Sequence, residues 1–217
     1  MNNYRITIVV PCWKRPLRTI RMLQNIMAQD MTEWEAFFIG DGCADFDKML
    51  QTSEVQDIQK KAAQQGSLLH IFNWHEHMGG WGQHILNYAI DNSRGQFFIF
   101  AANDDEILPN HFRHYLSEIE ESPMDLVAYK TFIAPNNEMR APQFRACEIG
   151  HSEIILRTSV LKGLPKVPPS GTHDWSLIDE MLRASQKYKQ ALSQSWTYKV
   201  NQLLGQSDNP RNVDVID

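Results

Sequence analysis

Three short polar segments contain side chains that could bind a ligand or a cation, and each segment follows an apolar run. They are residues 11–15, 40–45 and 102–106. The third contains the neighbouring carboxylates Asp104 and Asp105, which need a cation or solvent to compensate them at such a position. Mg²⁺ and Mn²⁺ prefer oxygen ligands of this kind and commonly add substrate phosphates. The alternative interpretation is an acidic turn that leads into a helix.

Two further features could contact a nucleotide. Asp41 lies between two glycines, where its carboxylate could accept from a nucleoside base or a ribose hydroxyl, or could equally form an Asx-turn. Residues 78–82 form a glycine-rich stretch before a predicted helix, whose N-terminus would suit a phosphate. This stretch matches neither the Walker loop nor the dinucleotide-binding pattern, so a tight structural loop is the alternative.

Two other residues have both a catalytic and a structural interpretation. Asp174 stands where a polar loop enters a predicted helix, so it could be a general base or the helix N-cap. Cys12 follows the first predicted strand, but no motif places a base beside it. A buried and inert thiol is therefore the preferred interpretation of Cys12.

Predicted strands and helices alternate along the first half of the chain, and the polar segments lie between them. Runs rich in β-branched and aromatic residues predict strands, and apolar residues at every third or fourth position predict helices. The predicted strands are residues 5–10, 36–39, 68–72 and 96–101, and the predicted helices are residues 17–27, 45–65 and 81–92. This alternation predicts an α/β fold with a mostly parallel sheet and helices on both faces. The polar segments then meet at the carboxyl ends of the strands, where such sheets bind ligands.

The pattern is less regular after about residue 123. Strands are predicted over residues 125–133 and 152–156, and a helix is predicted over residues 174–185. Residues 205–217 are polar and are expected to form a loosely held tail. A single domain over residues 1–204 is expected.

Composition narrows the class of protein. The 217 residues carry 21 basic and 26 acidic side chains, and the resulting net charge of −5 disfavours nucleic-acid binding. Hydrophobic residues make up 42% of the chain, which is too many for a disordered protein, and no apolar run is long enough to span a membrane. Three cysteines at unrelated spacings exclude a disulfide framework. Without a recognisable leader, the sequence predicts a cytoplasmic protein.

Taken in order, five segments resemble the family 2 glycosyltransferases of the GT-A fold. The resemblance extends from Ile6 to about Leu116, and it depends on five weak motifs that occur in the order of the family. The segments are residues 8–16, residues 22–29 with 34–35, residues 37–45, residues 87–90 with Gly95, and residues 100–109, the last of which is similar to the family's Asp-x-Asp-Asp segment.

The sequence departs from the family pattern at three of these motifs. Gly40 and Ala102 stand where the family has the first aspartate of its Asp-Asp-Gly-Ser and Asp-x-Asp-Asp patterns. Leu86 replaces an arginine, so the phosphate contact is expected from Gln83 or His84 instead. Many members also carry a histidine near the diphosphate, but residues 198–207 contain none.

The resemblance implies an inverting, metal-dependent glycosyltransferase that uses a nucleoside diphosphate sugar, with uridine as the expected nucleoside. It also implies that residues 1–204 form a nucleotide-binding half up to about residue 108 and an acceptor half from about residue 109. The acceptor would be a hydroxyl group in glycan or polysaccharide synthesis, and Mn²⁺ or Mg²⁺ would be the cofactor. The implied nucleotide-binding residues are Pro11, Trp13, Arg15, Asp41, Gln83, His84 and Asn103, the metal ligands are Asp104 and Asp105, the catalytic base is Asp174, and the acceptor residues are His173 and Trp175.

Two other functions stay open at this point. A sugar nucleotidyltransferase would share the α/β fold, but it would normally carry glycines in the loop after the first strand, where residues 11–15 have none. A non-catalytic carbohydrate- or nucleotide-binding protein is compatible with the missing aspartates. No nucleic-acid partner and no transmembrane segment are expected, and association with a membrane surface stays open.

Overall fold

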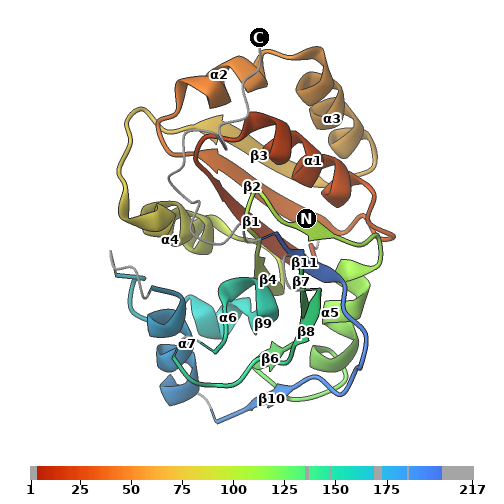
Figure 1. Cartoon of the computed structure of the whole chain (residues 1–217), viewed down its shortest axis with the longest axis vertical. Coiled ribbons are helices and arrows are strands. Elements are labelled where there is room, and N and C mark those ends of the chain that lie inside the picture. Colours follow the sequence, from red (N-terminus) through yellow and green to blue (C-terminus); the bar gives the residue numbers. More distant parts are fainter. Residues whose placement is uncertain (1–3, 135–136, 147, 169–172, 185, 202–217) are drawn as a thin grey trace.

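Figure 1 shows the computed structural model of the chain, which describes residues 4–134, 137–146, 148–168, 173–184 and 186–201. The expected tail over residues 205–217 lies outside the described residues, as do the side chains of Trp81, His173 and Asp174.

A seven-stranded sheet forms the centre of the molecule, with the strand order β10-β6-β9-β4-β1-β2-β3. Strand β1 pairs in parallel with β2 and β4, and β2 pairs in parallel with β3. Strand β9 alone runs antiparallel to both of its neighbours in this sheet. The mostly parallel sheet expected from the sequence is therefore confirmed. Its strands are β1 (Ile6–Cys12), β2 (Trp34–Gly40), β3 (Leu68–Asn73), β4 (Phe97–Phe100), β6 (Leu126–Ala128), β9 (Ile154–Arg157) and β10 (Tyr188–Gln190).

Helices cover both faces of this sheet (Figure 1). One face packs on α1 (Pro16–Met27), α2 (Ala44–Leu50), α3 (Ser53–Gln64) and α5 (His111–Ile119). The other face packs on α4 (Gln83–Asn92), α6 (Thr158–Leu161) and α7 (His173–Ala184). Because side chains alternate along a strand, Ile8 and Val10 of β1 join the first core, whereas Val9 between them joins the second.

Two segments differ from the sequence-based expectation. The stretch over residues 45–65 forms two helices rather than one, because Thr52 caps α3 by accepting the Val55 N–H at its Oγ1 (3.4 Å). The stretch over residues 125–133 forms β6 and β7, which belong to different sheets. The second sheet was not expected and has the order β5-β11-β7-β8, with β5 (Glu106–Ile107), β7 (Thr131–Ile133), β8 (Glu138–Arg140) and β11 (Tyr198–Val200).

A buried carboxylate joins three strands and a loop within the main sheet. Glu35 of β2 is fully buried, and its Oε2 accepts from Thr7 Oγ1 (2.9 Å) and from the Arg94 N–H (2.7 Å). Its Oε1 lies 3.1 Å from His70 Nε2. Burial alone would raise the pKa of Glu35, but the contacts with His70, Arg94 and Thr7 outweigh burial and lower this pKa below its ordinary value.

We expect the Glu35→Ala variant to lower the free energy of unfolding by about 1–3 kcal/mol, because it leaves buried donors without an acceptor. Since the pKa of Glu35 is lower in the folded state, this stabilisation is complete above the ordinary value of 4.5 and is lost as the pH falls through the folded-state pKa. Urea unfolding of the parent and the variant over a pH series measures this difference. The exposed Glu33 provides the control, and an equal pH dependence in Glu33→Ala would contradict the prediction.

Candidate functional site

The three polar segments expected to act together meet at one edge of the main sheet. Strand β1 lies between β2 and β4 and is parallel to both, so the carboxyl ends of these strands are neighbours. The Asp41 N–H donates to the carbonyl of Cys12 (2.9 Å), and the Ala101 N–H donates to the carbonyl of Val9 (3.0 Å). The loops that follow β1, β2 and β4 therefore share this edge, as the sequence predicted.

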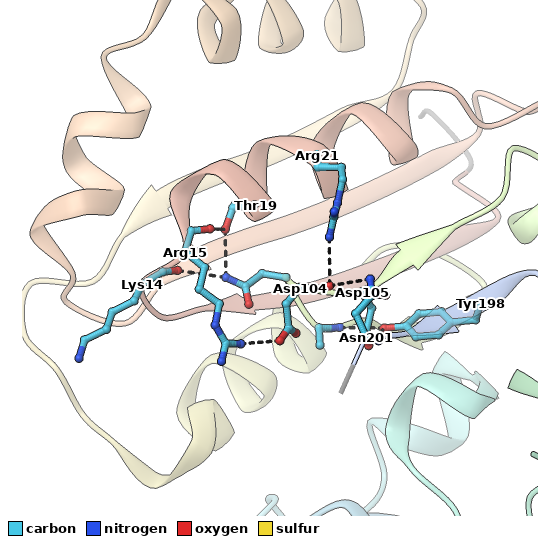
Figure 2. A network of polar contacts seen from close by, with 10 residues as sticks. Lys14, Arg15, Thr19, Arg21, Asp104, Asp105, Tyr198 and Asn201 are labelled. Atoms are coloured by element: carbon cyan, nitrogen blue, oxygen red, sulfur yellow. Dashed lines mark hydrogen bonds and ion pairs between the residues drawn. The ribbon is translucent and has the colours of Figure 1, made fainter. Parts of the chain in front are cut away.

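Asp104 is paired with an arginine from the loop that follows β1. Nη1 of Arg15 lies 2.5 Å from Oδ2 of Asp104, and the side chains are only 20% and 19% exposed. Figure 2 shows Arg15 extending from the start of α1 to this carboxylate. The carboxylate expected to hold a cation therefore already has a positive partner within the chain.

The backbone that presents Arg15 is held in an uncommon conformation. Lys14 and Arg15 have φ angles of 54° and 63°, in the left-handed region that residues other than glycine rarely adopt. Asn103, which is 5% exposed, holds this loop because its Nδ2 donates to the carbonyl of Lys14 (3.2 Å) and to Thr19 Oγ1 (3.0 Å). The amide of Asn103, expected to contact the nucleotide, thus joins the loops after β1 and β4.

Asp105 faces the protein interior and is held by the second sheet (Figure 2). Tyr198 Oη donates to Oδ2 of Asp105 (2.8 Å), and the Asn201 N–H donates to Oδ1 (2.8 Å). Burial first, and then the charge of Asp104, raise the pKa of Asp105 to about 7. Since both oxygens of Asp105 are used inside the protein, its position differs from that expected of a second metal ligand.

The remaining charges around this loop are also balanced within the chain. Arg21 Nη1 lies 3.4 Å from Oε1 of Glu106, and Lys199 Nζ lies 3.1 Å from Oε2. The main-chain carbonyl of Asp104 accepts from Arg21 Nη2 (3.2 Å) and from Asn201 Nδ2 (3.0 Å). Burial would raise the pKa of Glu106, but its bonds from Lys199 and Asn201 outweigh burial and lower this pKa. The acidic loop is therefore close to neutral.

Asp41 joins the end of β2 to the loop that follows β3. Its carboxylate is 6% exposed, and its Oδ1 accepts from the Met78 N–H (3.0 Å). His84 Nε2 lies 3.0 Å from the same oxygen, and His77 Nδ1 lies 2.9 Å from Oδ2. A carboxylate and two imidazoles are thus brought together, although the sequence indicated only Asp41 and His84 as nucleotide-binding residues.

An aromatic surface lies beside Asp41. The rings of Trp13 and His77 stack with their centroids 3.8 Å apart and their planes 20° from parallel. Trp13 is 38% exposed, and Lys14 Nζ lies 5.2 Å from the centroid of its ring. A flat and partly exposed aromatic surface of this kind can stack on a nucleobase.

The glycine-rich loop brings Pro11 and Gln83 to the same edge. Gly80 and Gly82 have φ angles of 60° and 78°, which favour glycine. A Cβ on Gly82 would lie 3.0 Å from Cβ of Pro11, and a Cβ on Gly80 would lie 2.2 Å from Oε1 of Gln83. That Oε1 is buried and has no hydrogen-bond partner among the described residues. The positive φ angles therefore favour glycine at both positions, and the close packing adds to this preference.

The replacement of an aspartate by Gly40 has a direct steric reason. A Cβ on Gly40 would lie 2.4 Å from Oδ1 of Asn73. This amide accepts from the Cys43 N–H (3.2 Å) and donates to the Cys43 carbonyl (2.9 Å). Asn73 thus takes the space that a side chain at position 40 would need.

The expected acceptor residues lie at the start of α7. This helix begins at His173, so Asp174 is its second residue and not its N-cap. The side chains of His173 and Asp174 lie outside the described residues. Trp175 is partly buried and packs against the core on the α4 face of the sheet. The proposed base is therefore carried by a helix on that face.

Cys12 matches the inert interpretation. Its thiol is 1% exposed and donates to the carbonyl of Val10 (3.2 Å). Burial raises the pKa of Cys12 well above its ordinary value, so its reactive thiolate form is disfavoured.

The sequence did not indicate Arg21, Tyr198 or Asn201 as site residues, and it indicated His77 only as a loop residue or a less favoured zinc ligand. For residues 198–207, the family pattern led only to the expectation of a histidine, which is absent there. Tyr198 and Val200 are buried while Lys199 between them is partly exposed, a two-residue alternation typical of a strand. Three residues are too few for such a pattern to be recognised in advance.

The donor atoms allow one kind of divalent-cation site. Among the described residues, no group of three His, Cys, Asp or Glu side chains could hold a metal ion. Arg15 contacts Oδ2 of Asp104, and Oδ1 has no hydrogen-bond partner among the described residues. One or two carboxylates suffice for a cation that also binds substrate phosphates. The residues therefore fit a cation that arrives with a diphosphate, and they offer only a weak site to a cation held by protein atoms alone.

The sequence profile described as "Glycosyl transferase family 2" matches residues 7–179. The chain belongs to this family. The family and the enzyme class expected from the sequence are thereby confirmed. The Escherichia coli (strain K12) protein named as glycosyl transferase WcaA of colanic acid biosynthesis is 23% identical over 120 residues, which are 55% of this chain and 39% of the relative.

Solved structures share the fold of this family 2 glycosyltransferase. S. aureus TarS, residues 1–349 with UDP-GlcNAc, has a TM-score of 0.71 and 19% identity, over 90% of this chain and 58% of TarS. Mannosyltransferase PcManGT from Pyrobaculum calidifontis, with GDP-Man and Mn²⁺, has a TM-score of 0.68 and 16% identity, over 91% of this chain and 57% of PcManGT. The GT-A fold is thus confirmed, and the chain spans less than two thirds of each of these proteins. Within the described residues, no helix is both long and apolar enough to span a membrane.

Proposed function

We propose that this chain transfers a sugar from a nucleoside diphosphate sugar, with uridine as the expected nucleoside, to a hydroxyl group of a glycan or polysaccharide. The observation that carries the proposal is the meeting of Arg15, Asp41 and Asp104 at the ends of three neighbouring strands. The complexes of TarS with UDP-GlcNAc and of PcManGT with GDP-Man support the class of donor. The name of the E. coli relative supports a polysaccharide acceptor.

The donor would lie across the carboxyl ends of the strands. The nucleobase would stack near Trp13 and His77, and Asp41 would accept from the base or the ribose. The diphosphate would extend toward Arg15 and the glycine-rich loop before α4, where positive charge and backbone N–H groups favour an anion.

The proposed reaction inverts the anomeric carbon. Asp174 would take the proton from the acceptor hydroxyl as its oxygen attacks this carbon, and the bond from the carbon to the diphosphate oxygen would break. His173 and Trp175 would shape the acceptor site. Asp104 would hold Mn²⁺ or Mg²⁺, which when bound would neutralise charge on the departing diphosphate.

A non-catalytic binding protein on the same fold is the second candidate. Two observations favour it, because Arg15 occupies Oδ2 of Asp104 and both oxygens of Asp105 are used internally. Hydrolysis of a nucleoside diphosphate sugar, measured with and without Mn²⁺, distinguishes the two functions. Donor binding without hydrolysis or transfer would favour the non-catalytic function.

The nucleotide site is tested by titrating nucleoside diphosphates into the parent chain and an Asp41→Ala variant. We expect the parent to bind a nucleoside diphosphate, and we expect the variant to bind it about 1–3 kcal/mol more weakly, the effect of losing a hydrogen bond to a charged group. Isothermal titration calorimetry measures both affinities. Asp57→Ala removes an exposed carboxylate of α3 as the control, since Asp57 is 62% exposed. Equal affinities in the parent and Asp41→Ala would contradict a nucleotide-binding role for Asp41.

A further inference from the structure

The acidic loop after β4 has three acidic residues, and three positive side chains lie beside it. Residues 104–106 are all acidic, and Arg15, Arg21 and Lys199 each lie within 4 Å of one of their carboxylates. Of these three side chains, only that of Arg15 contacts the carboxylate of Asp104. Any divalent cation that approaches Asp104 would therefore meet a positive charge already in place.

The backbone of Arg15 is held in place by the structure around it. Lys14 and Arg15 both adopt left-handed backbone conformations, which residues other than glycine keep only where their surroundings hold them. The buried amide of Asn103 bonds the carbonyl of Lys14, and the carbonyl of Arg15 accepts from the Thr19 N–H (3.1 Å). The pairing of Arg15 with Asp104 is thus built into the turn between β1 and α1.

An arginine and a divalent cation compete for the same carboxylate. The guanidinium keeps its charge at every physiological pH, so it repels a second cation at short range. This repulsion is relieved only when Arg15 leaves Asp104 or when an anion joins the site. The diphosphate of the proposed donor is such an anion, and it offers the oxygen atoms that arginine binds best.

We propose that Arg15 competes with the divalent cation for the carboxylate of Asp104. It occupies the carboxylate while no donor is bound, and it turns to the diphosphate when cation and donor arrive together. This inference rests on the proposed function and adds a consequence to it. Binding of the cation and binding of the nucleoside diphosphate favour each other, and by reciprocity each raises the affinity of the other by the same factor.

The competition is tested with Mn²⁺ alone, titrated into the full chain while electron paramagnetic resonance measures free Mn²⁺. Arg15→Gln removes the competing charge, so we expect Mn²⁺ affinity without nucleotide to rise about tenfold, within the usual range of coupling between sites. Arg15→Lys keeps the charge and is expected to stay close to the parent. Adding Asp104→Asn to Arg15→Gln should abolish the gain, because the gain depends on that carboxylate.

Arg21→Gln is the matched control. Arg21 belongs to α1 and lies at the same loop, but it contacts the main-chain carbonyl of Asp104 and the side chain of Glu106. We expect this variant to change Mn²⁺ affinity by less than about threefold, as exposed charges interact weakly. Three results would overturn the inference. Mn²⁺ affinity could rise equally in Arg15→Gln and Arg21→Gln, it could fail to rise in Arg15→Gln, or no variant could bind Mn²⁺ with or without UDP.

A second measurement separates this inference from the proposed function. UDP affinity is measured with and without Mn²⁺ in the parent and in Arg15→Gln. We expect Mn²⁺ to strengthen UDP binding in the parent and to strengthen it less in the variant. If the parent hydrolyses the donor but Arg15→Gln shows no rise in Mn²⁺ affinity, the inference about competition is wrong and the proposed function stands. If Mn²⁺ affinity rises in Arg15→Gln but the parent neither binds UDP nor hydrolyses donors, the proposed function is wrong.

Discussion

Replacing Asp174 with asparagine is expected to lower the transfer rate by about a hundred- to ten-thousand-fold, the usual contribution of a general base. The amide cannot take the proton of the acceptor hydroxyl at neutral pH. Asp174 is the second residue of α7, where a negative charge stabilises a helix by about 0.3–1 kcal/mol, so the fold and donor binding should hardly change. The rate of sugar transfer under single-turnover conditions measures the effect.

Asp179 of the same helix offers the control for this prediction. It pairs with Arg183 one turn later, at 2.7 Å, and so has a structural partner of its own. The Asp179→Asn variant should retain the transfer rate of the parent. If Asp174→Asn is fully active, the carboxylate only supports the start of α7, and the general base lies elsewhere.

Removing the carboxylate of Asp104 is expected to abolish cation-dependent nucleotide binding. In the parent, UDP and Mn²⁺ at a hundred times the dissociation constant should add about 2.7 kcal/mol of stability. For a chain of this size, that corresponds to a rise of about 5–10 °C in the melting temperature. In Asp104→Ala this Mn²⁺-dependent rise should disappear, and thermal unfolding with UDP, with and without Mn²⁺, measures it.

The variant without ligand provides the internal control. Asp104 is partly exposed and its partner Arg15 can turn to solvent, so the melting temperature of the unliganded Asp104→Ala variant should stay near that of the parent. Equal Mn²⁺-dependent shifts in the parent and the variant would place the cation elsewhere.

The sequence predicted the main sheet well because its signals are local. β1 and β2 are apolar runs that end at Cys12 and Gly40, and α1 shows apolar residues at helical spacing from Ile20 to Ile26. The second sheet could not be predicted in this way. Its strands have two or three residues each, and β11 pairs with β5 and β7 across long stretches of sequence.

The sequence predicted where the site lies in the fold, but it did not predict which side chains contact one another there. Parallel strands bring their carboxyl ends together, so Asp41 and Asp104 could be placed at one edge from the strand pattern alone. The contact between Arg15 and Asp104 depends on two residues in left-handed conformations, for which Lys14 and Arg15 give no signal. The inward position of Asp105 likewise depends on Tyr198, which is 93 residues away.

The hydrogen bonds from β11 to the acidic loop also set an order of assembly. They join Asp105 to Tyr198 and to the Asn201 N–H across 93 and 96 residues, whereas β1, β2 and β3 precede the loop in the chain. Because a ribosome delivers residues in order, the strands of the main sheet can pair before Tyr198 exists. The buried carboxylate obtains its donors only when residues 198–201 arrive. We therefore expect a nascent chain to complete the edge that we propose for donor binding only after residues 198–201 have been made.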